Sequence, residues 1–361
     1  MTATVMITTG GTGGHVFPGL AVAAKLLARG CRVFWLGTRE GMEARLVPAH
    51  GVEFESVSFR GVRGKGLRTL VFGPFTLLRA CLDSVRIIRR RRPDVVLGFG
   101  GFASFPGALM SVAAGKPLVV HDANAVAGLA NRVLAYGADR VLLGFPNALR
   151  GQAKQTAWIG NPLRDDIVAL RPPVERFAGR SGPLRVLVVG GSLGAAALND
   201  TIPVALAKLA PDRRPIVVHQ TGERHIAQVR SAYARAGVEA ECVPFIEDMA
   251  ARYAWADIVV CRGGALTIAE LAAVGLGAVV VPLPGAIADE QSANARFLLD
   301  AGGAIVMSQA ELTQPDAPLA GLLRDLTREQ ALTMAIAAHR VGKRDAADRV
   351  AEACIEMAAK K

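Results

Sequence analysis

Short apolar runs alternate with amphipathic stretches along the chain, and this alternation predicts parallel strands with helices between them. The run "TVMITTGG" predicts a strand, Pro18–Arg29 predicts a helix, and "RVFWLGT" predicts a second strand. Further strands are expected at "DVVLGFGG", "PLVVHDAN" and "RVLLGF". Strands that alternate with helices form βαβ units, so we expect an α/β fold with doubly wound parallel sheets.

The pattern starts again after "GRSGP", with strands expected in "LRVLVVGG", "RPIVVHQTG", "ADIVVC" and "GAVVVPLP". Each half opens with an apolar strand that ends in Gly-Gly and leads into a helix, at Ile7–Gly14 and at Val186–Gly194. We therefore predict two Rossmann-like domains, 1–160 and 161–343, which face a central cleft where the strands end. The stretch 344–361 has one apolar face, and we expect it to form a helix that packs back on the first domain.

Two stretches, 95–115 and 271–288, lack charged residues for about the length of a membrane span. Both contain glycines and a proline, so we interpret them as buried strand–loop–helix passages of a parallel sheet. The five cysteines are scattered and form no C-x-x-C pair, which favours a reducing compartment and argues against a disulfide framework or a zinc site. No signal peptide is recognised at the start of the chain.

The net charge of +11 is unevenly distributed. Between Arg60 and Arg92 there are ten Lys or Arg residues and one acid, Asp83, which gives this stretch a net charge of +9. The cations alternate with apolar residues, a pattern that suits an anionic membrane surface. A solvated helix face beside the core is the alternative. Nucleic acid is disfavoured, because no stacking aromatics or recognised motif accompany the charge.

The loop Gly10–Gly14 lies where a strand turns into a helix. Glycine permits a positive φ and lets a ligand approach backbone N–H groups, and the following helix presents its positive end to anions. The loop therefore suits a diphosphate or a sugar, although a tight structural turn uses the same residues. It is no Walker A loop, because no G-K-[ST] follows, and Val16 stands where the third glycine of G-x-G-x-x-G belongs. His15 at its end is either a general base or a helix-terminus histidine bonded to backbone.

Three further segments carry candidate chemistry. In "CRGGALTIAELAAVG", two glycines precede a helix whose second turn contains Glu270, which is placed to bind ribose hydroxyls or simply to stabilise the helix dipole. The segments "HDAN" and "DEQSANA" present polar residues that suit a ligand or a turn. No H-E-x-x-H, D-x-D or metal-ligand cluster is present in the sequence, so a metal-dependent mechanism has no support from it.

Taken in order, the motifs resemble those of the MurG family of N-acetylglucosaminyltransferases. They are "GGTGGHVFPGLAVA", "GVRGKG", "FGGFASFPG", "HDAN" with "GLANR", "GNPLR", "GGSLGA", "FIEDMAARYAWADIVVCRGGALTIAEL" and "DEQSANA". The resemblance runs from about Val5 to the last helix. The family usually reads "HEQN" where this chain has Asp122 and Ala123 in the middle pair.

The resemblance implies a GT-B fold and transfer of GlcNAc from UDP-GlcNAc to the C4 hydroxyl of the lipid-linked muramoyl peptide, lipid I. It implies inversion at the anomeric carbon, no cofactor and no metal in the chemistry. The C-terminal domain would hold the donor, and the N-terminal domain would take the acceptor at the cytoplasmic face of the bacterial inner membrane as a peripheral protein. Proteins of cell-wall assembly become candidate partners.

The resemblance also assigns residues by position. His15 matches the general base. Contacts with UDP-GlcNAc fall on Thr12, Gly13, Gly14, Asn124, Arg164, Ser192, Ile246, Ala265, Leu266, Thr267, Ile268, Ala269, Glu270 and Gln291. The basic and apolar stretch assigned to membrane docking comprises Arg63, Lys65, Leu67, Arg68, Leu70, Val71, Phe72, Phe75 and Arg79.

Three other functions remain open from the residues alone. The first is another GT-B enzyme that uses a UDP-sugar. The second is an NADP-dependent oxidoreductase in which Arg39 reads a 2′-phosphate, although the glycine fingerprint of that class is absent. The third is a non-catalytic membrane-bound scaffold, which predicts loss of His15 or Glu270, whereas both are present.

Overall fold

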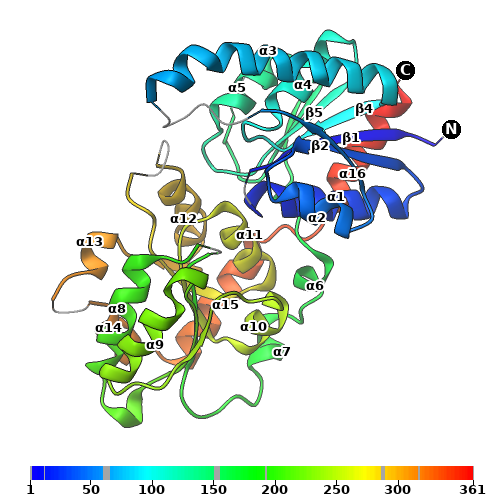
Figure 1. Ribbon diagram of the computed structural model, residues 1–361. Coiled ribbons are helices and arrows are strands. Elements are labelled where there is room, and N and C mark those ends of the chain that lie inside the picture. Colours follow the sequence, from blue (N-terminus) through cyan, green and yellow to red (C-terminus); the bar gives the residue numbers. More distant parts are fainter. Residues whose placement is uncertain are drawn as a thin grey trace. The chain divides into compact units, whose positions relative to one another are not determined.

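The structure is a computed structural model, and it describes residues 2–11, 13–59, 66–149, 155–191, 193–285, 289–315 and 318–360, with the side chains of 66–72 excepted. The chain divides into two compact units (Figure 1). The first comprises Met1–Arg164 together with Arg344–Lys361, and the second comprises Asp165–Lys343.

The first unit is built on a seven-stranded parallel sheet in the order β3-β2-β1-β4-β5-β6-β7. Its strands are β1 Thr4–Thr8, β2 Arg32–Thr38, β3 Glu53–Val57, β4 Val95–Gly98, β5 Leu118–Asp122, β6 Arg140–Leu143 and β7 Thr156–Trp158. Its helices are α1 Gly13–Ala28, α2 Glu43–Ala49, α3 Gly66–Arg91, α4 Phe105–Ala113, α5 Leu129–Ala135 and α16 Ala346–Ala359.

Side chains of each strand alternate between two cores, one on each face of this sheet. Val5 and Ile7 of β1 pack in a core with α1 and α16, whereas Met6 packs in the other core, with α3 and α4. This is the period of two that a strand imposes on its side chains. In Figure 1, α3, α4 and α5 lie on one face of the sheet, and α1 and α16 lie on the other.

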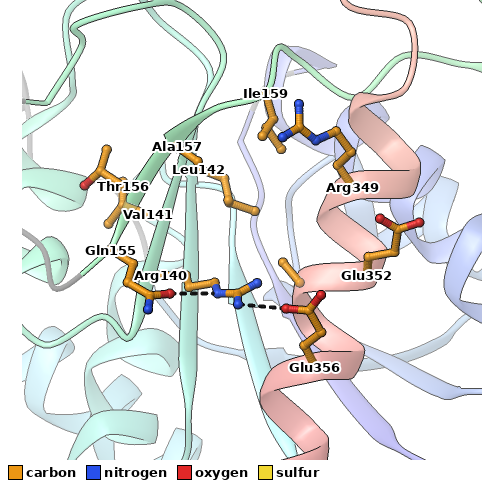
Figure 2. Close-up of a pocket in the computed structure, with 11 residues that line it drawn as sticks. Arg140, Val141, Leu142, Gln155, Thr156, Ala157, Ile159, Arg349, Glu352 and Glu356 are labelled. Carbon is orange, nitrogen blue, oxygen red and sulfur yellow. Dashed lines mark hydrogen bonds and ion pairs between the residues drawn. The ribbon is translucent and has the colours of Figure 1, made fainter.

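The C-terminal helix α16 belongs to the first unit, beside α1, although it follows the whole second unit in sequence. Val350, Ala351 and Cys354 are fully buried in the core that α16 shares with α1. An ion pair also joins α16 to the sheet: Arg140, at the start of β6, lies 2.7 Å from Glu356 and donates from Nε to Gln155 (Figure 2). The apolar face expected at 344–361 is the face that packs.

The second unit has a six-stranded parallel sheet in the order β10-β9-β8-β11-β12-β13. Its strands are β8 Arg185–Val189, β9 Ile216–Gln220, β10 Glu241–Val243, β11 Ile258–Cys261, β12 Gly277–Val280 and β13 Ala304–Val306. Its helices are α6 Asp165–Val168, α7 Pro173–Phe177, α8 Ala196–Ala207, α9 Ile226–Arg235, α10 Met249–Trp255, α11 Ala265–Val274, α12 Glu290–Asp300, α13 Gln309–Leu312, α14 Pro318–Asp325 and α15 Arg328–Val341, with short 3-10 turns at Pro211–Arg213 and Glu223–His225.

One element begins elsewhere than the sequence predicts. Helix α1 starts at Gly13 rather than at Pro18, and Pro18 lies inside it. Proline favours the first helical position because its missing N–H would have no partner there. Here it costs one backbone hydrogen bond, and the helix gains an extra turn that includes His15. His15 is therefore held by helical backbone rather than by a loop.

Candidate functional site

The glycine loop after β1 is braced by a buried acid that sequence reasoning missed. Glu43, the first residue of α2, is fully buried. Its Oε1 accepts hydrogen bonds from the N–H of Thr38, at 2.9 Å, and from the Thr38 hydroxyl, at 2.6 Å. Its Oε2 accepts from the N–H of Gly11, at 3.2 Å. One carboxylate thus joins the ends of β1 and β2 and fixes the loop that leads to α1.

Two glycines of this loop are required by the geometry. A Cβ on Gly10 would overlap the carboxylate of Glu43. Gly11 has a φ of 101°, a conformation that side-chain-bearing residues rarely adopt. Thr12 lies outside the described residues, whereas Gly13 and Gly14 form the first two positions of α1.

His15 lies in the first turn of α1 and is half-buried. Nδ1 is buried and has no hydrogen-bond partner among the residues that the structure describes. Burial lowers the pKa of His15 from its usual 6.5, and the backbone carbonyl of Phe99 opposes this shift only in part. The imidazole is therefore neutral at pH 7, which is the form able to accept a proton.

A second histidine lies beside the first. His121, at the end of β5, is fully buried, and its Nε2 donates to the carbonyl of Gly160 at 3.0 Å. Burial lowers its pKa to about 4, and the nearby charge of His15 acts in the same direction. The ring of His121 also packs against Phe99, with 5.2 Å between the ring centroids. The carboxyl ends of β1, β4 and β5 thus bring two imidazoles together.

Asp122, the acid of "HDAN", stabilises the turn that follows β5. Asp122 is buried, and its Oδ1 accepts from the N–H of Asn124 at 3.1 Å. Its Oδ2 accepts from the side chain of Asn131, at 2.9 Å, and from the N–H of Gly128, at 3.3 Å. Asp122 therefore holds the connection from β5 to α5, and Asn124 is presented at the start of that connection.

Arg164 is the last residue of the first unit, and it lies near the start of α1. Its guanidinium carbon is 6.0 Å from the centroid of the Phe17 ring, two residues after His15. Asn124, Arg164 and His15 thus all belong to the first unit.

The second unit has its own cavity, of about 510 Å³, where β8 and β11 end. It is lined by the glycine loop after β8 and by Arg262, Gly264, Thr267, Gln291 and Gln309 among others. Two of the predicted donor contacts, Thr267 and Gln291, therefore share one cavity. Ser192, a third, lies outside the described residues.

Gln291 has a fixed orientation in this cavity. Its Oε1 accepts from the N–H of Gly263, at 3.2 Å, and from the N–H of Leu283, at 3.0 Å. With its oxygen used twice by backbone, the side chain keeps its NH₂ group for a ligand hydroxyl. Arg262, which the sequence analysis did not single out, donates to Gln309 at 2.8 Å, and burial lowers its pKa.

The residues predicted to contact uridine lie at two places in the second unit, helix α11 and the segment that contains Ile246. Helix α11 begins at Ala265, after the N-cap Gly264, and includes Ala265, Leu266, Thr267, Ile268, Ala269 and Glu270. Glu270, in its second turn, accepts from the hydroxyl of Tyr253 at 2.9 Å. Ile246 has a buried side chain, and its backbone makes no hydrogen bond within the described part of the chain. A free N–H and carbonyl suit the recognition of a base edge.

Helix α3 carries the basic stretch. Ala80, Ser84 and Ile88 are buried against the first unit, whereas Phe75, Leu78 and Leu82 are 69%, 59% and 51% exposed. Arg79 is also exposed. Arg63 and Lys65 lie outside the described residues, and for Leu67, Arg68, Leu70, Val71 and Phe72 only the helical backbone is described. The exposed apolar residues recur at the spacing of one helix face.

Three negative findings apply to the described ranges. No three His, Cys, Asp or Glu side chains there come together as a metal site. No helix among those residues has both the length and the apolar character to cross a membrane. A further cavity of about 370 Å³, between β6, β7 and α16, has none of the predicted site residues among its described lining residues (Figure 2).

Family models match both halves of the chain. The N-terminal domain of glycosyltransferase family 28 matches residues 5–143. The C-terminal domain of the same family matches residues 185–350.

Curated relatives match over the full length. The UDP-N-acetylglucosamine–N-acetylmuramyl-(pentapeptide) pyrophosphoryl-undecaprenol N-acetylglucosamine transferase of Aromatoleum aromaticum is 55% identical over 356 residues, which are 99% of this chain and 98% of the relative. The transferase of the same name from Dechloromonas aromatica is 51% identical over 358 residues, which are 99% of this chain and 100% of the relative.

Solved structures of glycosyltransferases also match the chain over nearly its full length. The crystal structure of Acinetobacter baumannii MurG matches with a TM-score of 0.82 and 36% identity, over 98% of this chain and 99% of that one. The kitacinnamycin glycosyltransferase, with a TM-score of 0.71 and 19% identity over 98% of this chain and 100% of that one, shares the fold. The predicted class of two Rossmann-like GT-B domains is confirmed. Because the similarity extends through both halves at more than half identity, this chain belongs to the MurG family of glycosyltransferases.

Proposed function

We propose that this protein transfers GlcNAc from UDP-GlcNAc to the C4 hydroxyl of lipid I and so forms lipid II for peptidoglycan synthesis. The observation that carries the proposal is 55% identity over 99% of the chain to the transferase of that name from Aromatoleum aromaticum. The half-buried imidazole of His15, neutral at pH 7, lies at the glycine loop and can accept the proton of the acceptor hydroxyl.

The donor is assigned to the second unit. Its cavity is lined by the start of α11, which suits a diphosphate, and by Gln291, which suits a sugar hydroxyl. As the bond to the anomeric carbon breaks, negative charge develops on the UDP leaving group. Backbone N–H groups at a helix start and a glycine loop stabilise that charge without having to reorganise. Glu270 would then accept the ribose hydroxyls.

The first unit is assigned to the acceptor and to the membrane. The exposed face of α3, defined by Phe75, Leu78 and Leu82, would insert its apolar side chains at the interface. The surrounding cations would contact anionic headgroups. This makes the protein peripheral on the anionic cytoplasmic leaflet.

The direct test is transfer of radiolabelled GlcNAc from UDP-GlcNAc to a short-chain lipid I analogue, with EDTA in one arm and Mg²⁺ in the other. We expect labelled product in both arms. Product only with Mg²⁺ would contradict the metal-free mechanism. No product in either arm would contradict the proposed acceptor. UDP-GlcNAc, but not NADPH, should raise the melting temperature, which separates a transferase from an oxidoreductase.

Membrane docking is tested separately with vesicles that contain anionic lipid. Neutralising Arg63, Lys65 and Arg68 together should weaken sedimentation with these vesicles at low salt, because each cation near an anionic surface contributes about 1 kcal/mol. Arg349→Gln, which removes an exposed cation from α16, is the control for the loss of positive charge elsewhere. Binding of the triple variant at the wild-type level would place the membrane face elsewhere.

A further inference from the structure

A second cavity of the first unit, of about 720 Å³, lies where β1, β2 and β3 end. It extends from Gly11 in the glycine loop to Arg79 on α3, and the segment Thr38–Gly41 after β2 forms part of its wall. The cavity therefore adjoins both the loop that precedes His15 and the helix whose exposed face is assigned to the membrane. None of the donor contacts predicted from the sequence is among its described lining residues.

Two guanidinium groups line this cavity without carboxylate partners in the described part of the chain. They belong to Arg39, just after β2, and to Arg79, and both residues are exposed. Farther along α3, by contrast, Arg86, Arg90 and Arg91 are paired with Asp83, Glu55 and Glu53. Glu40 also lines the cavity, so its described wall carries two cations and one anion. That balance favours an anionic ligand.

The aromatic wall connects the cavity to the glycine loop. Phe59 is buried, and Phe102 is 41% exposed, with 6.0 Å between their ring centroids. The ring of Phe102 lies against Gly11, so close that a Cβ there would be 3.3 Å from it. The wall of the cavity therefore includes the glycine two positions before the start of α1.

The connectivity of the acceptor decides which anion fits. Its sugar hydroxyl must reach His15, and its lipid must remain in the membrane against the exposed face of α3. The diphosphate joins these two parts, so it must lie between them. Arg79 is one helical turn from the exposed Phe75 and also lines the cavity.

We propose that this cavity binds the diphosphate of the lipid-linked acceptor, held by Arg39 and Arg79. The inference rests on the proposed function and extends it, because it names the cavity and the residues that hold the diphosphate of the acceptor. It also gives Arg79 a second role besides the membrane contact expected from the sequence. Guanidinium groups suit a diphosphate because they donate two parallel hydrogen bonds to its oxygens.

The test compares Arg39→Gln, Arg79→Gln and the double variant with Arg86→Gln, which removes the same charge from α3 outside the cavity. The first readout is the KM for a short-chain lipid I analogue. The second is calorimetric binding of geranyl diphosphate, with saturating UDP present to occupy the donor site. We expect each cavity variant to weaken both by about tenfold. The Kd for UDP should be unchanged, and Arg86→Gln should behave like wild type.

Glu40→Gln provides a test of opposite sign. Removing the single described carboxylate of the wall should tighten geranyl diphosphate binding rather than weaken it. Unchanged binding and KM in the double variant would overturn the proposal. A raised KM for the lipid I analogue with unchanged geranyl diphosphate binding would assign the arginines to another acidic group of the acceptor, and would overturn it too. Absence of transfer by the wild type would instead count against the proposed function.

Discussion

Glu43→Gln tests whether one buried carboxylate holds the glycine loop in place. Glutamine has nearly the same shape as glutamate, so the packing around it is retained. Its amide oxygen can keep the two hydrogen bonds from Thr38 that now reach Oε1. Its NH₂ group then replaces Oε2 and faces the N–H of Gly11, so two donors oppose each other and that N–H loses its partner.

The size of the effect follows from that lost contact. A hydrogen bond to a charged group contributes about 1.5–3 kcal/mol. We expect the loop to lose about 2 kcal/mol of local stability, which corresponds to roughly 30-fold faster exchange of the Gly11 amide hydrogen. Hydrogen exchange is the right assay, because a chain of two units has no single free energy of unfolding. The KM for acceptor should rise, with the Kd for UDP unchanged.

Glu352→Gln is the control for the loss of a carboxylate as such. Glu352 is exposed and lies 3.5 Å from Arg29, an arrangement that contributes at most about 1 kcal/mol. Its exchange pattern around the glycine loop should match that of the wild type. If Gly11 exchanges equally slowly in Glu43→Gln and in the control, the bracing role of Glu43 is refuted.

Three further predictions concern individual side chains. His15→Gln should reduce kcat by about 10²–10⁴-fold with little change in UDP affinity. Because burial lowers the pKa of His15, the acidic limb of the wild-type profile of kcat against pH should lie below pH 6.5. A limb at higher pH would exclude His15 as the base. Glu270→Gln should weaken UDP binding about tenfold. Tyr253→Phe, which removes only the hydroxyl that donates to Glu270, should retain most of the affinity for UDP. Equal UDP affinities in the wild type and in Glu270→Gln would rule out the ribose contact. His219 is buried in the second unit, and burial lowers its pKa to about 4. The folded state therefore binds a proton at His219 less readily than the unfolded state does. Stability that is present above pH 6.5 is lost as the pH falls towards 4, by up to about 3 kcal/mol. In His219→Gln, the urea midpoint for unfolding of the second unit should change less between pH 6.5 and pH 4 than it does in the wild type. An equal change in both proteins would contradict this account.

The strands that could be predicted were those with a strong apolar run, such as β1, β5 and β11. Strands β3, β7, β10 and β13 were missed. The last three are only three residues long, and β3, with the sequence EFESV, has only two apolar positions, so none of them stands out as an apolar run. The early start of α1 was missed because glycines and Pro18 are poor helix formers. Tertiary contacts with the sheet outweigh that local preference.

Site residues on glycine loops could be predicted because their backbone chemistry follows from residue type alone. Glu43 could not, since "GMEARL" reads as an ordinary exposed helix start, and only the fold brings its carboxylate to the N–H of Gly11. Arg39 and Arg79 were named from the sequence for two separate roles, but their shared cavity could not be predicted, because forty residues separate them and only the fold brings them together. The resemblance supplied His15 and Gln291 as candidates, and the structure adds the burial and hydrogen bonds that explain their chemistry.

The position of α16 has a consequence for synthesis on the ribosome. The first unit cannot complete its core until Val350, Ala351 and Cys354 have been made, and these residues follow the whole second unit in sequence. The second unit, 165–343, needs no later segment for its sheet. The unit that is translated first is therefore the last to be complete, and it waits with the face of α1 uncovered while the other folds. A chain that stops after residue 343 would keep all residues of its second unit and lose the part of the first core that α16 supplies.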